Sequence, residues 1–156
     1  MRKLFTLFLT VVLLGACSGT AKPGFTPDDV NFKLAGKTLT PGMDYTDPVV
    51  KDWTNFEEMD SCLYIGKDRI YTYDGAIIYT FPDEGNDYIL EIELTGSSKT
   101  GRGIGIGSTM DEVIAKYGET YEEKGLTVVY TSDLYQLILT MVNDKVEKIR
   151  LKYITE

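Results

Sequence analysis

The chain has 156 residues, with 16 basic and 24 acidic side chains, a net charge of −8 and no histidine. Without histidine it lacks the commonest general base and the usual zinc ligand, and its negative charge disfavours nucleic acid and bare anionic membrane as partners. We therefore expect a noncatalytic protein with no cofactor, no metal site and no nucleic-acid partner.

The first sixteen residues have the pattern of an export signal. Arg2 and Lys3 precede an apolar stretch of eleven residues, Leu4 to Leu14, and small residues follow it. This is the tripartite plan of a secretory signal. A helix of that length, at about 1.5 Å per residue, is too short for a bilayer core of about 30 Å. We therefore expect residues 1–16 to be removed.

The run Leu14-Gly15-Ala16-Cys17 resembles the lipobox of bacterial lipoproteins. The resemblance implies that Cys17 is acylated and becomes the mature N-terminus. Two or three acyl chains anchor a protein durably, whereas one holds it only marginally. The alternative is an ordinary secretory signal with a chance cysteine. We expect export, lipid anchoring to the outer leaflet of the cell membrane or to an outer membrane, and a flexible tether over residues 17–29, where Gly, Thr, Pro and Asp are frequent.

Residues 30–156 are long enough for a single domain with one hydrophobic core. With Cys17 acylated, Cys62 has no other cysteine in the chain to pair with. We therefore expect no intramolecular disulfide and a buried, unreactive Cys62. A reactive thiol is the alternative interpretation.

Two stretches of this domain can be aligned with each other. Gly42 aligns with Gly107 at an offset of 65, and Ile92 aligns with Ile149 at an offset of 57. The offset changes only between the predicted elements, as expected for a duplicated unit whose loops differ in length. The alignment predicts two related units, residues 30–97 and 98–156, within the one domain.

Each unit is predicted to begin with a short helix. In the second unit, Thr109 and Glu112 form a capping box for a helix over residues 110–117. In the first unit, Asp47 suits the N-cap and the proline after it suits the first helical position, so a helix is expected to run to about residue 53 or 56.

A three-stranded meander is predicted after each helix. The strands alternate apolar and polar residues, as is typical of a sheet with one covered face. They cover residues 69–73, 76–81, 88–95, 126–131, 135–142 and 145–153. The prediction is therefore an α+β fold, in which two related helix-plus-three-stranded antiparallel meander units form one sheet with helices packed on one face.

The run from Gly103 to Val113, closed by Tyr117-Gly118 and followed by the second meander, resembles a family of bacterial envelope proteins. These are small lipoproteins with a β-lactamase-inhibitor-protein-like fold, and they include the small lipoprotein of the outer-membrane β-barrel assembly machinery. The resemblance covers mainly residues 103–153, and the first unit departs from it through Pro48. It implies a noncatalytic module that works through protein contact.

Three polar stretches could suggest ligand sites. The glycines of residues 101–107 lack the spacing of a P-loop or a dinucleotide turn, so we interpret them as the entry to a capped helix. The acidic residues within 52–60 and within 83–87 lack the order of a calcium loop. We interpret the first of these as a solvated surface and the second as a turn.

The last strands of the two units carry opposite charges at equivalent outward positions. If the two strands are neighbours, these charges neutralise each other across the sheet. Alternatively, they form a recognition surface together with two tyrosines, because tyrosine interleaved with charge is typical of contact patches. The candidate binding face consists of Tyr71, Tyr73, Glu91, Glu93, Lys148 and Arg150.

The sequence thus predicts a lipid-anchored envelope lipoprotein that binds an envelope protein, or another envelope component, through its exposed sheet face. Capture of a small ligand or cation is the alternative, although about 125 residues are too few for the two lobes of a typical solute receptor. An enzyme of unknown class is the third possibility.

Overall fold

The computed structural model describes residues 24–155, so the predicted signal, Cys17 and most of the predicted tether lie outside the described residues. The strands are β1 (Phe32–Leu34), β2 (Lys37–Leu39), β3 (Asn55–Asp60), β4 (Lys67–Tyr73), β5 (Ala76–Asp83), β6 (Asn86–Leu94), β7 (Glu122–Lys124), β8 (Thr127–Ser132), β9 (Tyr135–Val142) and β10 (Lys145–Tyr153). The helices are the 3-10 helix η1 (Pro27–Val30) and the α-helix α1 (Met110–Tyr117).

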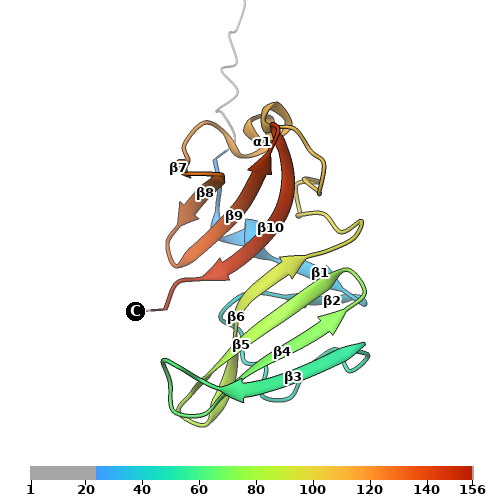
Figure 1. Cartoon of the computed structure of the whole chain (residues 1–156), viewed down its shortest axis with the longest axis vertical. Helices are drawn as coiled ribbons and strands as arrows, with labels where there is room; N and C mark the ends of the chain where they lie inside the picture. The colour runs from blue at the N-terminus through green and yellow to red at the C-terminus, as the bar shows by residue number, and fades with distance from the viewer. Residues whose placement is uncertain (1–23, 156) are drawn as a thin grey trace, which may run out of the picture.

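Eight of these strands form one antiparallel sheet in the order β3-β4-β5-β6-β10-β9-β8-β7, and β1 and β2 form a separate hairpin (Figure 1). The predicted α+β class with repeated helix-plus-meander units is therefore wrong: the described chain is mainly β, with a single α-helix. All six predicted strands are present. The strands β3 and β7, which the sequence did not predict, extend the sheet at its two edges.

The helix predicted over residues 110–117 is confirmed. The hydroxyl of Thr109 accepts a hydrogen bond from the backbone nitrogen of Glu112 at 3.3 Å, and the carboxylate of Glu112 accepts one from the backbone nitrogen of Thr109 at 2.9 Å. These reciprocal bonds satisfy two donors that a helix start leaves free.

The helix predicted from Asp47 is absent: residues 47–53 form neither helix nor strand, and pairing with β4 begins at Thr54. The backbone nitrogen of Thr54 donates to the carbonyl of Thr72 at 2.7 Å, and β3 begins at the next residue. Tryptophan, threonine, asparagine and phenylalanine at positions 53–56 are weak helix formers and, apart from asparagine, common in strands. The edge of β4 therefore decides the structure of this segment.

The core lies between one face of the sheet and a layer made of the β1–β2 hairpin, connecting loops and α1 (Figure 1). Strands β6 and β10 pair at the middle of the sheet, with Ile92 opposite Leu151 and Leu94 opposite Ile149. All four side chains are at most 1% exposed. The pairing therefore joins the β3–β6 meander and the β7–β10 meander over one core.

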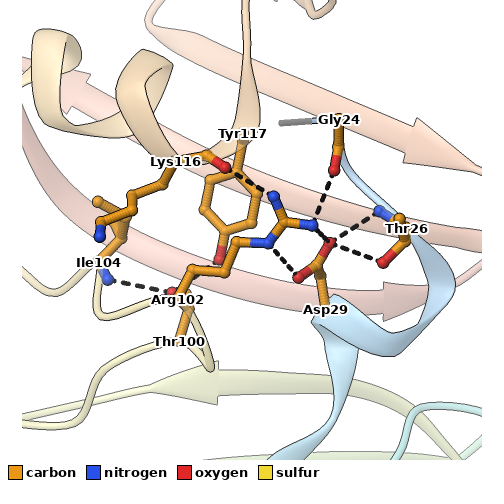
Figure 2. Close-up of polar contacts among 8 residues, drawn as sticks. All are labelled: Gly24, Thr26, Asp29, Thr100, Arg102, Ile104, Lys116 and Tyr117. Atoms are coloured by element: carbon orange, nitrogen blue, oxygen red, sulfur yellow. Dashed lines mark hydrogen bonds and ion pairs between the residues drawn. The ribbon is translucent and has the colours of Figure 1, made fainter. Parts of the chain in front are cut away.

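Arg102 connects the first described residues to the C-terminal turn of α1 (Figure 2). Its Nε and Nη2 donate to the two carboxylate oxygens of Asp29 at 2.5 and 2.6 Å. Nη1 donates to the carbonyl of Lys116 at 2.6 Å, and Nη2 also donates to the carbonyl of Gly24 at 2.8 Å. The guanidinium carbon lies 5.0 Å from the centre of the Tyr117 ring. One side chain thus fixes where the chain enters the domain.

Residues 24–29, the end of the predicted tether, are part of the packed structure. The ring of Phe25 lies 6.1 Å from that of Tyr117 and 6.3 Å from that of Tyr130, measured between centroids. The carboxylate of Asp29 also accepts hydrogen bonds from the backbone nitrogen and the hydroxyl of Thr26. Ordered packing therefore already includes Phe25.

Replacing Arg102 with Met is expected to lower the free energy of unfolding by about 2 to 4 kcal/mol, because it leaves the shielded carboxylate of Asp29 without its cation. The side chain of Asp29 is 9% exposed and that of Arg102 is 25% exposed. Urea unfolding measures the change. The control is Lys99→Met at an exposed position of the same loop, for which we expect a change within about 0.5 kcal/mol. Equal losses for the two variants would contradict this role of Arg102.

Candidate functional site

The six residues of the predicted binding face do not form one surface. Tyr71 and Tyr73 are each 5% exposed and lie in the core, whereas the four charged residues lie on the opposite face of the sheet. The hydroxyl of Tyr73 donates to the carbonyl of Val50 at 2.9 Å and lies 2.9 Å from the hydroxyl of Tyr45. The turn after β4 pairs Tyr73 with Ala76. Since side chains alternate along a strand, this register assigns both tyrosines to the covered face.

The four charged residues neutralise one another across the β6–β10 pair. The ammonium of Lys148 lies 3.0 Å from the carboxylate of Glu93, and the guanidinium of Arg150 lies 3.7 Å from that of Glu91. Because these strands are neighbours, the geometry favours the first of the two interpretations. Burial raises the pKa of Glu91, and the nearby Arg150 only partly offsets this effect.

A different cluster of side chains is exposed at the sheet edge formed by β3. Of the nine large apolar side chains that are exposed among the described residues, six lie between positions 49 and 65. They are Val49, Trp53, Phe56, Met59, Leu63 and Ile65. All six residues of β3 are exposed, and the strand pairs only with β4. We call β3 together with these six side chains the β3 edge.

Two aromatic rings of the β3 edge pack against a buried tyrosine. The ring centroids of Phe56 and Trp53 lie 5.1 and 5.4 Å from that of Tyr71, and Tyr71 in turn lies 5.4 Å from Tyr45. Phe56 and Trp53 nevertheless remain 43% and 37% exposed. Tyr71 therefore supports an exposed aromatic surface although it is not itself accessible.

The loop between β3 and β4 adds the most exposed apolar side chains. Leu63 is 85% exposed and Ile65 is fully exposed, while the ring of Tyr64 packs on Phe81 at 5.1 Å. Cys62 is a free, exposed thiol. The prediction of a buried Cys62 is wrong, because the hairpin between β3 and β4 places residue 62 in a surface loop.

Charge is distributed unevenly between the two halves of the sheet. Residues 44–93, which include β3 to β5 and all but the last residue of β6, contain thirteen acidic and three basic side chains, whereas the rest of the described chain contains ten of each. All three basic residues of this half are already in ion pairs: Lys51 with Asp47, Lys67 with Asp60, and Arg69 with Glu58 and Asp87. The half that carries the β3 edge therefore has the domain's entire net negative charge.

The opposite edge of the sheet, formed by β7, differs from the β3 edge in its exposed apolar side chains and in its charge. Strand β7 has only three residues, and it belongs to the half with balanced charge. The nearest exposed apolar side chain is Leu126. Edge strands are potential templates for another chain, and short, charged ones are protected against this. Of the two edges, β3 is thus the better surface for binding.

The glycine-rich loop before α1 uses its polar groups internally. The hydroxyl of Thr100 accepts hydrogen bonds from the backbone nitrogen of Ile104 at 3.1 Å and from the hydroxyl of Tyr117 at 2.8 Å (Figure 2). The backbone nitrogen of Gly107 donates to the carbonyl of Val146. These contacts agree with a structural role for the loop.

Within residues 24–155, no cluster of three or more acidic or cysteine side chains has the arrangement of a metal site. No helix in this part of the chain is both long and apolar enough to span a membrane. A hollow of about 370 Å³ lies at one end of the sheet, and other surface hollows have volumes of about 230 to 600 Å³. Small ligands commonly bind in spaces of a few hundred Å³. The lining of the hollow at the end of the sheet includes Tyr64, Phe81, Leu134 and Tyr153.

No protein-family model, curated protein or solved structure matches this chain significantly.

Replacing Glu91 with Gln tests whether burial or the ion pair with Arg150 has the larger effect on the Glu91 carboxylate. A carboxyl whose pKa is raised by folding stabilises the protein below its unfolded pKa, and this contribution is lost as the pH rises through the folded pKa. Glutamine has no such charge to bury. We therefore expect the stability of the variant, relative to the wild type, to rise between about pH 4 and pH 7. Urea unfolding at several pH values measures this; the opposite trend would show that the ion pair with Arg150 outweighs burial.

Proposed function

We propose that this protein is a lipid-anchored envelope lipoprotein that binds another protein, without catalysis, through the β3 edge. The observation that supports this function best is the concentration of exposed apolar side chains on and next to β3, an edge strand that pairs with β4 on one side only. Exposed apolar patches on folded domains commonly mark interaction sites, and Trp53 and Phe56 lie together here with ring centroids 6.3 Å apart. An edge strand also offers free backbone donors and acceptors to an extended segment of a partner.

The two supported aromatic rings suit this role energetically. Binding costs free energy when flexible side chains become ordered. Trp53 and Phe56 already pack against Tyr71 in the unbound protein, so little of that cost remains. Aromatic side chains, tryptophan and tyrosine above all, are also enriched among the residues that dominate binding energies. These two residues are expected to contribute most of the affinity.

The point at which the chain enters the domain supports a β3 edge that faces away from the membrane. The first described residues enter the domain at the α1 end, whereas β3 lies at the other end of the long axis (Figure 1). Arg102 holds the carbonyl of Gly24 at this point. From Cys17 to Gly24 the chain can reach at most about 25 Å. An acylated Cys17 would therefore hold the α1 end near the membrane, and the acidic half would be repelled by anionic lipid.

The lipid anchor can be tested by mass spectrometry of the exported protein. We expect the N-terminal peptide to begin at Cys17 and to carry the mass of two or three acyl chains. Cys17→Ser should abolish that added mass, and the control Cys62→Ser should leave it unchanged. An unmodified Cys17, or a mature chain that begins at another residue, would contradict the anchoring.

The β3 edge can be tested by placing a photoreactive amino acid at Leu63 in living cells. The matched control is the same substitution at Leu126, which is 67% exposed near the opposite edge. We expect a discrete protein adduct from position 63, and its yield should fall at least fivefold when Trp53 and Phe56 are both replaced by Ser. An adduct from position 126 but not from position 63 would place the binding surface elsewhere.

A further inference from the structure

We infer that the β3 edge takes a cationic, extended peptide segment, which adds to the sheet as a ninth strand beside β3. This inference rests on the proposed binding function and specifies the chemistry of the partner. Its evidence is independent of the apolar exposure, because it comes from the distribution of charge and from the pattern of side chains along β3.

The net negative charge of residues 44–93, the acidic half, favours a positively charged partner. Ten of its thirteen carboxylates are not balanced by a basic side chain in the same half, and the three basic residues there are already paired. Two of the ten, Glu91 and Glu93, pair with basic residues of β10, which leaves eight to attract a partner. Fields of this kind steer oppositely charged segments and repel like-charged ones. A neutral or acidic strand would find the same backbone groups without this attraction.

The same charge argues against a second copy of this chain as the occupant. Three of the six residues of β3 are acidic: Glu57, Glu58 and Asp60. In an antiparallel pair of two β3 strands centred on the strand's midpoint, Glu57 of each copy faces Glu58 of the other. Like charges in directly opposed positions destabilise a sheet. Acidic residues on an edge strand thus discourage self-association while leaving a cationic strand favourable.

The register with β4 defines what a matching strand should contain. Phe56, opposite Tyr71, lies on the core side, and Glu57, opposite Ile70, lies on the outer side. A partner strand would place apolar residues beside Phe56 and Met59 and basic residues beside Glu57 and Glu58. The basic residue beside Glu58 would share that carboxylate with Arg69, which lies 3.0 Å from it. For antiparallel addition, this gives the capped probe peptide Lys-Val-Lys-Lys-Val-Thr.

Trp53 provides the binding signal, because it is the chain's only tryptophan and lies at the β3 edge. The full exported protein is titrated with three peptides: the cationic probe, the same peptide with every Lys replaced by Glu, and the cationic probe N-methylated at the amides that face β3. We expect the dissociation constant of the cationic probe to be at least tenfold lower than that of either other peptide. Its affinity should fall as the salt concentration rises.

Matched variants locate the charges responsible. The double variant Glu57→Gln with Glu58→Gln should weaken binding of the cationic probe at least fivefold and reduce its salt dependence. The control is Glu122→Gln with Glu123→Gln on the exposed strand β7, which should leave binding unchanged. Equal binding of the acidic peptide would overturn the cationic preference, and equal binding of the N-methylated peptide would overturn strand addition.

The result also separates this inference from the proposed function. If position 63 captures a partner in cells but the cationic probe leaves Trp53 fluorescence unchanged, the inferred partner chemistry is wrong and the binding function stands. If position 63 captures nothing and the probe does not bind, both are wrong.

Discussion

The pairing of β6 with β10 is the interaction on which the rest of this structure depends. On its covered side it brings Ile92 and Leu94 against Leu151 and Ile149 in the core, and on its outer side it brings glutamates opposite lysine and arginine. Without it, each meander would be a small sheet with too little apolar surface to bury. Because this pair occupies the middle of the sheet, β3 and β7 necessarily become its two edges.

These two edges have different physical properties although they terminate the same sheet. One has six residues, carries or adjoins exposed apolar and aromatic side chains and lies in the acidic half, and the other has three residues and lies in the electrically balanced half. An exposed edge strand with apolar side chains risks self-association. The acidic residues of β3 oppose it, because like charges on two copies repel each other. The Arg102–Asp29 contact then fixes the chain's entry at the end far from β3.

Local signals in the sequence predicted the six central strands and α1, because turn residues and a capping box act over a few positions. Asn143 and Asp144, for example, take the positive φ values of a tight hairpin turn. The sequence did not predict β3, since its structure depends on pairing with β4. The sequence predicts Tyr71 and Tyr73 on the exposed face, whereas the tight turn after Tyr73 pairs it with Ala76 and so places both tyrosines on the covered face. The charge asymmetry of residues 44–93 can be read from the sequence, and it distinguishes the half that carries the β3 edge.

The most direct measurement of the central claim is amide hydrogen exchange, residue by residue, with and without a saturating cationic strand peptide. If β3 is the binding edge, exchange should slow at the amides of residues 55–60 and stay unchanged in β7 and along β6 and β10. Slowing confined to β7, or spread over the outer sheet face with β3 unaffected, would contradict the account.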